Sequence, residues 1–380
     1  MTERLYYSNG HLCEFDATVL SCEKNGERYE IVLDRSAFFP EGGGQLGDSG
    51  YIGEIRVFDT HERGGEVFHY ANEPASVGTT VHCKIDFDIR FRRMQNHSGE
   101  HIVSGIVNKM FGYDNVGFHM GSEDITVDYN GYIEPEALRK IEAQANAAVF
   151  ANLKIKTEFP SADELSGLSY RSKLDLTENV RIVTVEGIDV CACCAPHVER
   201  TGEIGIIKLL DAIHYKGGIR IHLLCGYDAL CDYGKRYEAT KKIAAELCVK
   251  QEDAADAVFR KLDEFAEFRE KYASLKRELT DRKIAELKTT EGNIVVFEDD
   301  TDADTLRKIA DAGADLCTGV CAAFGKNGEA YNFCIVSRHV DLKKLTKEIN
   351  GAISGRGGGS SEMMRGVASA DRAAIENYFA

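Results

Sequence analysis

The chain has 380 residues, 43% of them hydrophobic, which is enough for two to four hydrophobic cores rather than one. Its net charge of −16 argues against the broad positive surface of a nonspecific nucleic-acid binder, but leaves room for a local basic face. No run of about 18 apolar residues occurs, and the N-terminal segment lacks the apolar core of a signal peptide. We therefore expect a cytoplasmic protein that does not contact a membrane.

The 12 cysteines are mostly scattered along the chain. A disulfide framework is typical of short secreted proteins, so the scattered cysteines are expected to be small buried apolar residues. Only Cys191, Cys193 and Cys194 cluster, and His197 follows them closely. In a reducing compartment this pattern indicates a metal site or a catalytic site.

Residues 1–88 are rich in strand signals, with strands expected at 29–33 and 51–58. Between them, residues 38–48 include three successive glycines, which fit neither a helix nor a strand. This glycine-rich loop (residues 38–48) is expected to bring its backbone close to another group, with a plain hairpin connection as the alternative.

A helix is expected to follow Asp88 as its N-cap and to end at Gly112. His97 and His101 lie one turn apart on it and share a face, and the glycine between them indicates that another group approaches there. A second helix is expected at 136–150, and strands are expected at 180–185, 204–210 and 219–224. The cysteine cluster would form the loop between the first two of these strands.

Residues 235–291 contain neither glycine nor proline, and apolar residues from Leu262 to Leu279 step by threes and fours. This pattern predicts an amphipathic arm of two helices, able to form a hairpin or a coiled coil. The last 90 residues predict a small α/β domain with strands at 293–297, 317–324 and 330–336. Its helices are expected at 305–312 and 371–379, and a glycine-rich segment lies at 354–361.

Two residue pairs have metal-ligand chemistry, His97 with His101 and Cys193 with His197. Zinc prefers four thiolate and imidazole ligands at tetrahedral angles, so these pairs predict a zinc site. Cys191 and Cys194 lie within reach of the same loop, but the spacing to His197 favours Cys193. The other two cysteines would pack below the site or tune it.

Residues 97–101 also fit the His-x-x-Glu-His pattern of inverted zinc peptidases. In that class Glu100 would be the general base and a downstream glutamate the third ligand. This alternative leaves Cys193, His197 and the glycine-rich loop without a role.

The motifs together resemble the free-standing alanyl-tRNA editing proteins of the AlaX type in their long form, and also the editing and C-terminal domains of alanyl-tRNA synthetase. In chain order, the resemblance is carried by residues 38–48, the helix of His97 and His101, residues 117–119, residues 193–205 and the glycine-rich residues 354–359. One departure is Cys193-Cys194-Ala195-Pro196-His197, where synthetases commonly have Cys-Gly-Gly-Thr-His. The cysteine and histidine ligands are present in both, but Pro196 makes the backbone between them stiffer here, and the threonine hydroxyl is absent.

The resemblance implies an α+β fold in four parts. These are a β-barrel domain with the glycine-rich loop at 1–88, a zinc-binding editing domain at 89–232, a helical arm at 233–290 and a glycine-rich α/β C-terminal domain at 291–380. It further implies one zinc ion per chain and hydrolysis of tRNA for alanine that carries serine or glycine. Without an aminoacylation domain, the chain is not expected to charge tRNA.

The resemblance also implies roles for individual residues. Gly43 and Gly44 would bind substrate through backbone N–H groups, and Gln45 would take part in catalysis or read the serine hydroxyl. His119 would lie on the substrate side or be a packed histidine, and Glu100 would be a base or a helix-stabilising residue.

Binding of the acceptor stem of tRNA requires phosphate contacts, for which Arg92 and Arg93 beside the zinc helix and Arg356 in the glycine-rich C-terminal segment are candidates. The arm or the C-terminal domain would make a homodimer. A second alternative is a non-catalytic module that binds tRNA through a closed structural zinc site.

Overall fold

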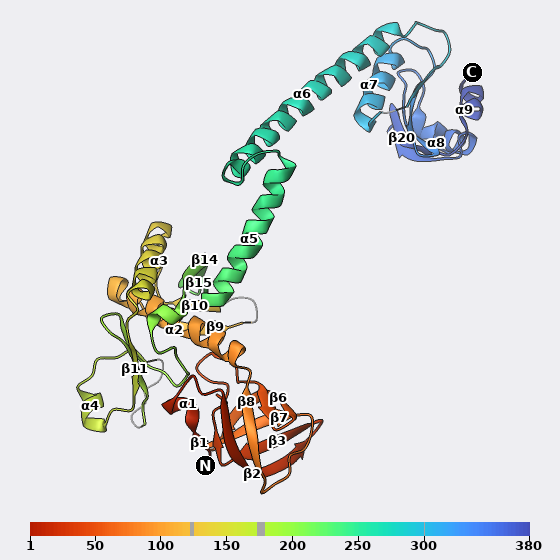
Figure 1. Ribbon diagram of the computed structural model, residues 1–380. Helices are drawn as coiled ribbons and strands as arrows, with labels where there is room; N and C mark the ends of the chain where they lie inside the picture. The colour runs from red at the N-terminus through yellow and green to blue at the C-terminus, as the bar shows by residue number, and fades with distance from the viewer. Residues whose placement is uncertain (122–124, 173–178, 300) are drawn as a thin grey trace. The chain divides into compact units, whose positions relative to one another are not determined.

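The computed structural model describes residues 1–121, 125–172, 179–299 and 301–380 (Figure 1). It divides into two compact units, Met1–Lys242 and Ile243–Ala380. Both units mix helices and sheets, which confirms the expected α+β class.

The first unit begins with six antiparallel strands that pair in the closed order β2-β3-β7-β6-β5-β8. Alternate residues of β2, such as Phe15, Ala17 and Val19, are buried in the apolar interior of this ring, as the period of two in a strand requires. The strands are β2 (Glu14–Asn25), β3 (Arg28–Leu33), β5 (Gly50–Ile52), β6 (Ile55–Arg63), β7 (Glu66–Ala71) and β8 (Thr80–Ile85). Before β2 lie the strand β1 (Glu3–Arg4) and the short helix α1 (Leu5–Ser8). The strand β4 (Arg35–Ser36) lies between β3 and β5 and pairs in parallel with β1.

The prediction of a single strand at 51–58 is wrong, because the chain turns back between β5 and β6. Ile52 pairs with Ile55, so the hairpin loop has only two residues, and Gly53 takes a positive φ of 59° there. A two-residue hairpin needs this left-handed conformation, which glycine adopts without strain.

The long helix α2 (Phe87–Phe111) follows β8 directly, so its N-cap is Asp86 rather than the expected Asp88. Asp88 lies in the first turn, where its charge interacts favourably with the helix dipole. The helix ends before Gly112 in the left-handed conformation, as expected.

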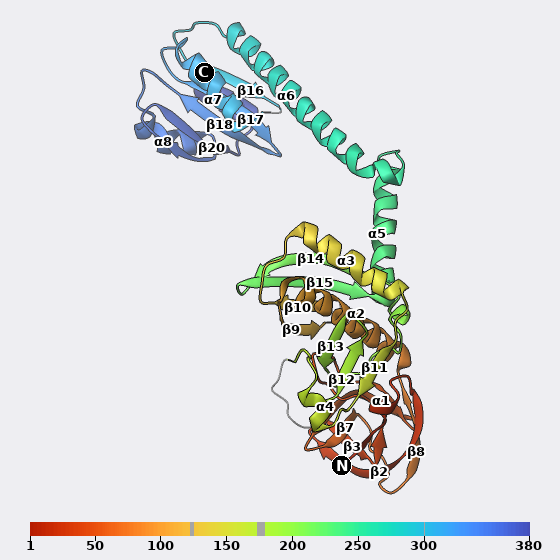
Figure 2. The same ribbon diagram turned by 90° about the vertical axis from the view of Figure 1, so that its left-hand side faces the viewer.

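Two sheets and helix α3 surround α2 (Figure 2). One sheet has the order β14-β15-β10-β9 and the other has the order β11-β12-β13. The strands are β9 (Asn115–Met120), β10 (Ile125–Tyr129), β11 (Ile155–Glu158), β12 (Ile182–Val185), β13 (Asp189–Ala192), β14 (Ile207–Tyr215) and β15 (Gly218–Cys225). The helices are α3 (Pro135–Phe150), α4 (Ala162–Ser166), the 3-10 turn η1 (Thr201–Ile204) and α5 (Gly226–Glu246). The strand expected at 204–210 starts only at Ile207, because the 3-10 turn occupies the preceding residues.

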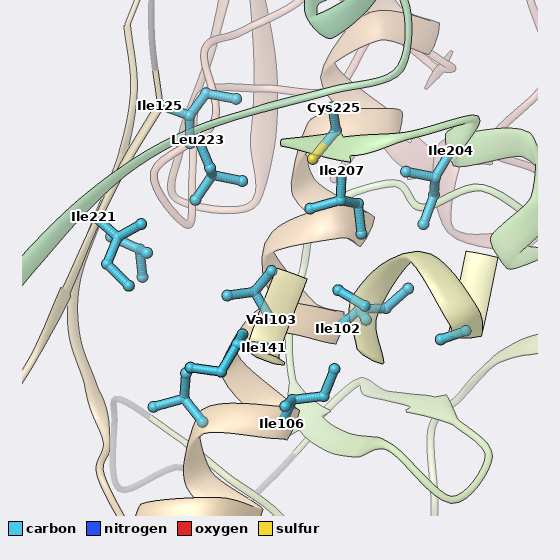
Figure 3. Close-up of a cluster of buried hydrophobic side chains, with 14 of the residues drawn as sticks. Ile102, Val103, Ile106, Ile125, Ile141, Ile204, Ile207, Ile221, Leu223 and Cys225 are labelled. Carbon is cyan, nitrogen blue, oxygen red and sulfur yellow. The ribbon is translucent and has the colours of Figure 1, made fainter. Parts of the chain in front are cut away.

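The apolar face of α2 forms the core of this region. Figure 3 shows Ile102 and Ile106 of α2 with Ile141 of α3 and Ile221 of β15 around them. The glycine between the two histidines serves this packing, because a Cβ at Gly99 would lie 2.3 Å from the sulfur of Cys225. The group that approaches there is thus strand β15.

The second unit contains the helices α6 (Ala254–Glu286), α7 (Ala303–Ala314), α8 (Leu342–Ala352) and α9 (Arg372–Phe379), with the 3-10 turn η2 (Gln251–Asp253) before them. Its sheet has the order β16-β17-β18-β20-β19. The strands are β16 (Ile294–Glu298), β17 (Cys321–Asn327), β18 (Ala330–Val336), β19 (Gly355–Gly359) and β20 (Met363–Ala368). The two helices expected at 235–291 are therefore α5, which begins earlier than expected, and α6.

This sheet is covered on both faces. Cys321 and Ala323 of β17 pack with α7, whereas the alternate residues Ala322 and Phe324 pack with α8 and α9. The glycine-rich segment forms the edge strand β19, which pairs with β20. It passes close to the core of the sheet, since a Cβ at Gly357 would lie 2.5 Å from the ring of Phe333. No helix within the described residues has the length and apolar character needed to cross a membrane.

A buried ion pair joins the barrel to α2. The Nε atom of Arg90 donates to a carboxylate oxygen of Asp48 at 2.8 Å, and its other nitrogens donate to the carbonyl oxygens of Ala37 at 2.6 Å and Gly10 at 3.1 Å. The side chains of Arg90 and Asp48 are 0% and 1% exposed. The backbone N–H of Phe39 donates to the same carboxylate at 2.6 Å, so the pair holds both ends of the glycine-rich loop.

Replacing Asp48 by Asn would leave the guanidinium of Arg90 buried without its counter-charge. We expect Asp48→Asn to lower the free energy of unfolding of the first unit by about 3–5 kcal/mol. Urea denaturation followed by circular dichroism measures it.

Lys140→Ala is the matched control, because it removes the exposed ion pair with Glu136 on α3 and should change stability by less than about 0.5 kcal/mol. Equal effects of the two substitutions would contradict the structural role of the buried pair.

Candidate metal centre and its cavity

Helix α2 and the loop after β13 bring four potential ligands together. The ligand atoms of His97, His101, Cys193 and His197 all lie within 4.8 Å of one another. The sulfur of Cys193 is 3.5 Å from Nε2 of His97 and 3.4 Å from Nε2 of His197. Zinc bonds of about 2.1 Å to nitrogen and 2.3 Å to sulfur at a tetrahedral angle separate the two ligand atoms by about 3.6 Å. The donor types and their spacing therefore fit a zinc ion.

Each histidine of this cluster is oriented by a partner on its other ring nitrogen. Nδ1 of His101 lies 3.0 Å from a carboxylate oxygen of Asp189, and Nδ1 of His197 lies 3.1 Å from the hydroxyl of Ser98. Nδ1 of His97 lies 3.1 Å from Oε1 of Gln45. With Nδ1 engaged, Nε2 is left for a metal ion, which is the usual arrangement around ligating histidines. Asp189 and Ser98 were not predicted from the sequence, since neither has a recognisable spacing to the four residues of the cluster.

The carboxylate of Asp189 is itself held by Arg171. The guanidinium donates to both carboxylate oxygens, at 2.7 and 2.8 Å. Burial disfavours the charged carboxylate, but the hydrogen bonds from His101 and Arg171 outweigh it, and the pKa of Asp189 lies below its usual value. Asp189 thus stays an acceptor that fixes the ring of His101.

Only one of the three clustered cysteines is disposed to be a thiolate. Burial opposes ionisation of Cys193, but the charges of His97 and His197 prevail and hold its pKa well below the usual value. Burial raises the pKa of Cys194 to about 11 and raises that of Cys191 as well. Because the thiolate is the form that binds metal, Cys193 is the metal-binding candidate among them.

A cavity of about 580 Å³ opens onto the cluster. Gly43 and Gly44 line it, and both have positive φ values, of 61° and 84°. A Cβ at Gly44 would lie 2.7 Å from the carbonyl oxygen of Phe118, so only glycine lets the loop approach β9 this closely. Among the described residues, neither glycine N–H donates a hydrogen bond.

Glu100 also lines the cavity, between the two histidines on α2. Its Oε1 accepts a hydrogen bond from the side chain of Asn115 at 2.6 Å and another from Ser104. Its carboxylate is therefore held in one orientation.

Two other expected site residues lie elsewhere. Gln45 is completely buried and is not part of the cavity lining, because its side chain turns to His97 from behind. This position favours a role in orienting His97 over direct contact with substrate. His119 on β9 is exposed and does not line the cavity, although its strand neighbours Gly117 and Phe118 do. Alternation along the strand places the side chain of His119 on the face opposite that of Phe118.

The three arginines considered for tRNA lie in different surroundings. Arg92 is half exposed and pairs with Asp228, while Arg93 donates to the carbonyl oxygen of Gly47 at 2.7 Å and so stabilises the glycine-rich loop. Arg356 is exposed on the edge strand β19 of the second unit.

The ligand cluster weighs against the peptidase pattern. In that pattern a glutamate completes the metal site, whereas here Cys193 and His197 occupy those positions beside His97 and His101.

Comparison with known proteins agrees with these motifs. A family model described as the threonyl and alanyl tRNA synthetase second additional domain matches residues 180–222, which include Cys193 and His197. A model described as tRNA synthetases class II (A) matches residues 8–89, which include the barrel and the glycine-rich loop.

Among known proteins, an alanyl-tRNA editing protein AlaX-L from Pyrococcus horikoshii is 35% identical over 240 residues, 60% of this chain and 59% of that protein. An alanine–tRNA ligase from Pyrococcus furiosus is 31% identical over 303 residues, 76% of this chain and 33% of the ligase. A ligase from Halorubrum lacusprofundi is 30% identical over 375 residues, 93% of this chain and 40% of the ligase. The chain thus spans less than two thirds of the length of these relatives. The 35% identity to an alanyl-tRNA editing protein confirms the resemblance that the motifs predicted.

One solved structure, the C-Ala domain of alanyl-tRNA synthetase from Aquifex aeolicus, matches with a TM-score of 0.21 and 20% identity. The match covers 24% of this chain and 92% of that domain.

The difference between the two adjacent thiols can be measured in the metal-free protein. At pH 6 to 7 Cys193 should react with iodoacetamide at least about tenfold faster than Cys194, because its pKa is lowered whereas that of Cys194 is raised, so that a larger fraction of Cys193 is thiolate. The reactivity of Cys194 should rise only as the pH approaches 11. Peptide mass spectrometry identifies the modified sulfur, and equal reaction of both thiols at pH 6 would show that the histidines do not stabilise a Cys193 thiolate.

The carboxylate of Asp189, which contacts Nδ1 of His101, should control metal affinity. We expect Asp189→Asn to weaken zinc binding by about 10- to 100-fold, because it replaces a charged acceptor on Nδ1 by a neutral amide. Competition with a chromogenic chelator measures the affinity. Glu186→Gln, an exposed substitution on the turn between β12 and β13, is the control, and an equal loss in both variants would refute the role of Asp189.

Proposed function

We propose that this chain, which resembles the alanyl-tRNA editing proteins, hydrolyses the ester bond of tRNA for alanine that carries serine or glycine. We also propose that one zinc ion per chain, held by His97, His101, Cys193 and His197, is required. The observation that carries the proposal is that this ligand cluster lies in one cavity of about 580 Å³ together with Gly43 and Gly44, whose N–H groups donate no hydrogen bond among the described residues.

The need for such a reaction follows from the chemistry of small amino acids. A synthetase site that binds alanine discriminates poorly against side chains of similar size, so errors require a second, hydrolytic site. The relatives of this chain bear the names of an alanyl-tRNA editing protein and of alanine–tRNA ligases, which supports a role on the same tRNA.

The residues that line the cavity would each have a different role in the reaction. A zinc ion bound at the cluster would supply a Lewis acid for a donor atom of the substrate or for water. The N–H groups of Gly43 and Gly44 would stabilise the carbonyl oxygen as negative charge develops on it. Glu100, held by Asn115, would accept a proton from the attacking water.

Arginines on both units are the residues that would contact the tRNA. We propose that Arg92, which is half exposed, pairs with Asp228 and lines a separate hollow, contacts phosphate, and that Arg93 acts mainly by holding the glycine-rich loop. Arg356 would contact another part of the tRNA from the second unit, and the helix α6, with its exposed apolar side chains, would support a homodimer.

A non-catalytic module that binds tRNA through a closed zinc site is the second candidate. It is favoured by the number of ligands, because a site with four protein ligands has no open position unless one is displaced. It predicts bound tRNA without any release of amino acid.

The test offers seryl-, glycyl- and alanyl-tRNA for alanine to the full chain, with and without a chelator. We expect release of serine or glycine but not of alanine, and loss of that release on chelation. Cys193→Ala should abolish it for lack of a metal ligand, whereas Cys248→Ala, which removes an exposed thiol, should not change it. Metal-replete protein that releases no amino acid would disprove the proposal and leave the binding module.

A further inference from the structure

The outer part of the cavity is lined by aromatic side chains that belong to none of the motifs. Tyr7 comes from α1, and Phe159 follows β11, so residues far apart in the chain meet there. Their ring centroids are 5.4 Å apart, with an angle of 71° between the planes. Phe159 is 51% exposed, which is more than packing within the protein would require of a large apolar ring.

Two cations lie next to this pair of rings. The guanidinium carbon of Arg181 is 5.5 Å from the centroid of Tyr7, and that of Arg4 is 5.8 Å from it. Arg181 is only 6% exposed, and its Nε has no hydrogen-bond partner among the described residues. Its Nη1 donates to the carbonyl oxygens of Cys193 and Ala195, at 3.0 and 2.8 Å. One side chain thereby fixes the aromatic pair relative to the metal-binding loop.

The hollow space continues past the aromatic pair. A second hollow of about 390 Å³ reaches Gly65 and shares four lining residues with the first cavity: Arg4, Tyr7, Phe159 and Asn179. The first cavity by itself lies within the range of about 300–1,000 Å³ that is usual for sites of whole small molecules, and the second hollow adds space next to it. This additional space suits a larger group joined to the amino acid.

We propose that Tyr7 and Phe159 form a stacking platform for the terminal nucleobase of the RNA to which the amino acid is esterified, with Arg4, which also pairs with Glu62 at 2.6 Å, facing its phosphate. This assignment rests on the proposed function and names the residues that would hold the end of the substrate. Aromatic faces next to a cation are how proteins bind unpaired bases, since every base has a face to stack. The platform would hold the base while the ester reaches the metal-binding loop.

The test measures binding of the RNA trinucleotide CCA to the full zinc-loaded chain by fluorescence competition, together with deacylation of seryl-tRNA. Phe159→Ala and Tyr7→Leu should each weaken CCA binding by roughly 5- to 100-fold, because each removes one stacking face. Both should raise KM for seryl-tRNA more than they lower kcat. Phe159→Trp, which offers a larger face, should bind CCA at least as tightly as the unaltered chain.

Phe150→Ala is the matched control, because Phe150 is 80% exposed at the end of α3 and lines neither hollow. It should leave CCA binding unchanged. Zinc content and circular dichroism of every variant show whether the fold is kept, and Phe159, being half exposed, should tolerate replacement.

The outcomes separate the platform from the proposed function. Unchanged CCA affinity in both folded platform variants, with deacylation by the unaltered chain, would overturn the platform and leave the proposed function standing. CCA binding that depends on both rings, without any deacylation, would support the platform and overturn the hydrolase. Failure of the unaltered chain to bind CCA, with an apolar peptide bound at the rings instead, would also overturn the platform.

Discussion

The arrangement of the site depends on the buried ion pair between Arg90 and Asp48. Arg90 lies near the start of α2, two turns before the first histidine, and Asp48 ends the glycine-rich loop. Two buried charges need partners for their polar atoms. Here two carbonyl oxygens accept from Arg90 and a backbone N–H donates to Oδ2 of Asp48, while Oδ1 of Asp48 has no hydrogen bond among the described residues and lies 3.8 Å from the guanidinium of Arg93. The barrel therefore cannot shift on α2 without exposing an unpaired charge, and the glycine-rich loop keeps its place beside His97.

Because the ion pair fixes the glycine-rich loop beside α2, the site is built in two layers. The inner layer is the cluster of three histidines and one cysteine, and the outer layer is the set of groups that orient each ring. Gln45 comes from the loop that the ion pair holds, Ser98 from α2 itself and Asp189 from β13. Each partner lies on a different element, so the cluster forms only when barrel, helix and small sheet are assembled. The electrostatics agree, since the histidines favour a thiolate at Cys193 alone.

The cavity beside the cluster joins this centre to groups of another kind. The glycine N–H groups and Glu100 lie near the ligands, whereas the rings of Tyr7 and Phe159 lie toward the second hollow. Arg181 links the two parts through the carbonyl oxygens of the metal-binding loop. This order of polar and aromatic groups is the basis of the proposed substrate, an aminoacyl ester of RNA, which has a small reactive end and a flat, charged body.

The sequence by itself predicted the four residues of the candidate metal cluster, the close approach of the glycine-rich loop, most helices and the α+β class. These depend on local rules: histidines four residues apart share a helical face, successive glycines break regular structure, and apolar periods of two and 3.6 separate strands from helices. The tertiary structure alone decided the turn at Gly53, the strand at Gly355–Gly359 and the position of Gln45 behind His97. It also decided the contacts of Asp189, Ser98, Tyr7 and Phe159. Their roles arise from neighbours distant in the chain, and no spacing within a sequence records which distant residues will meet.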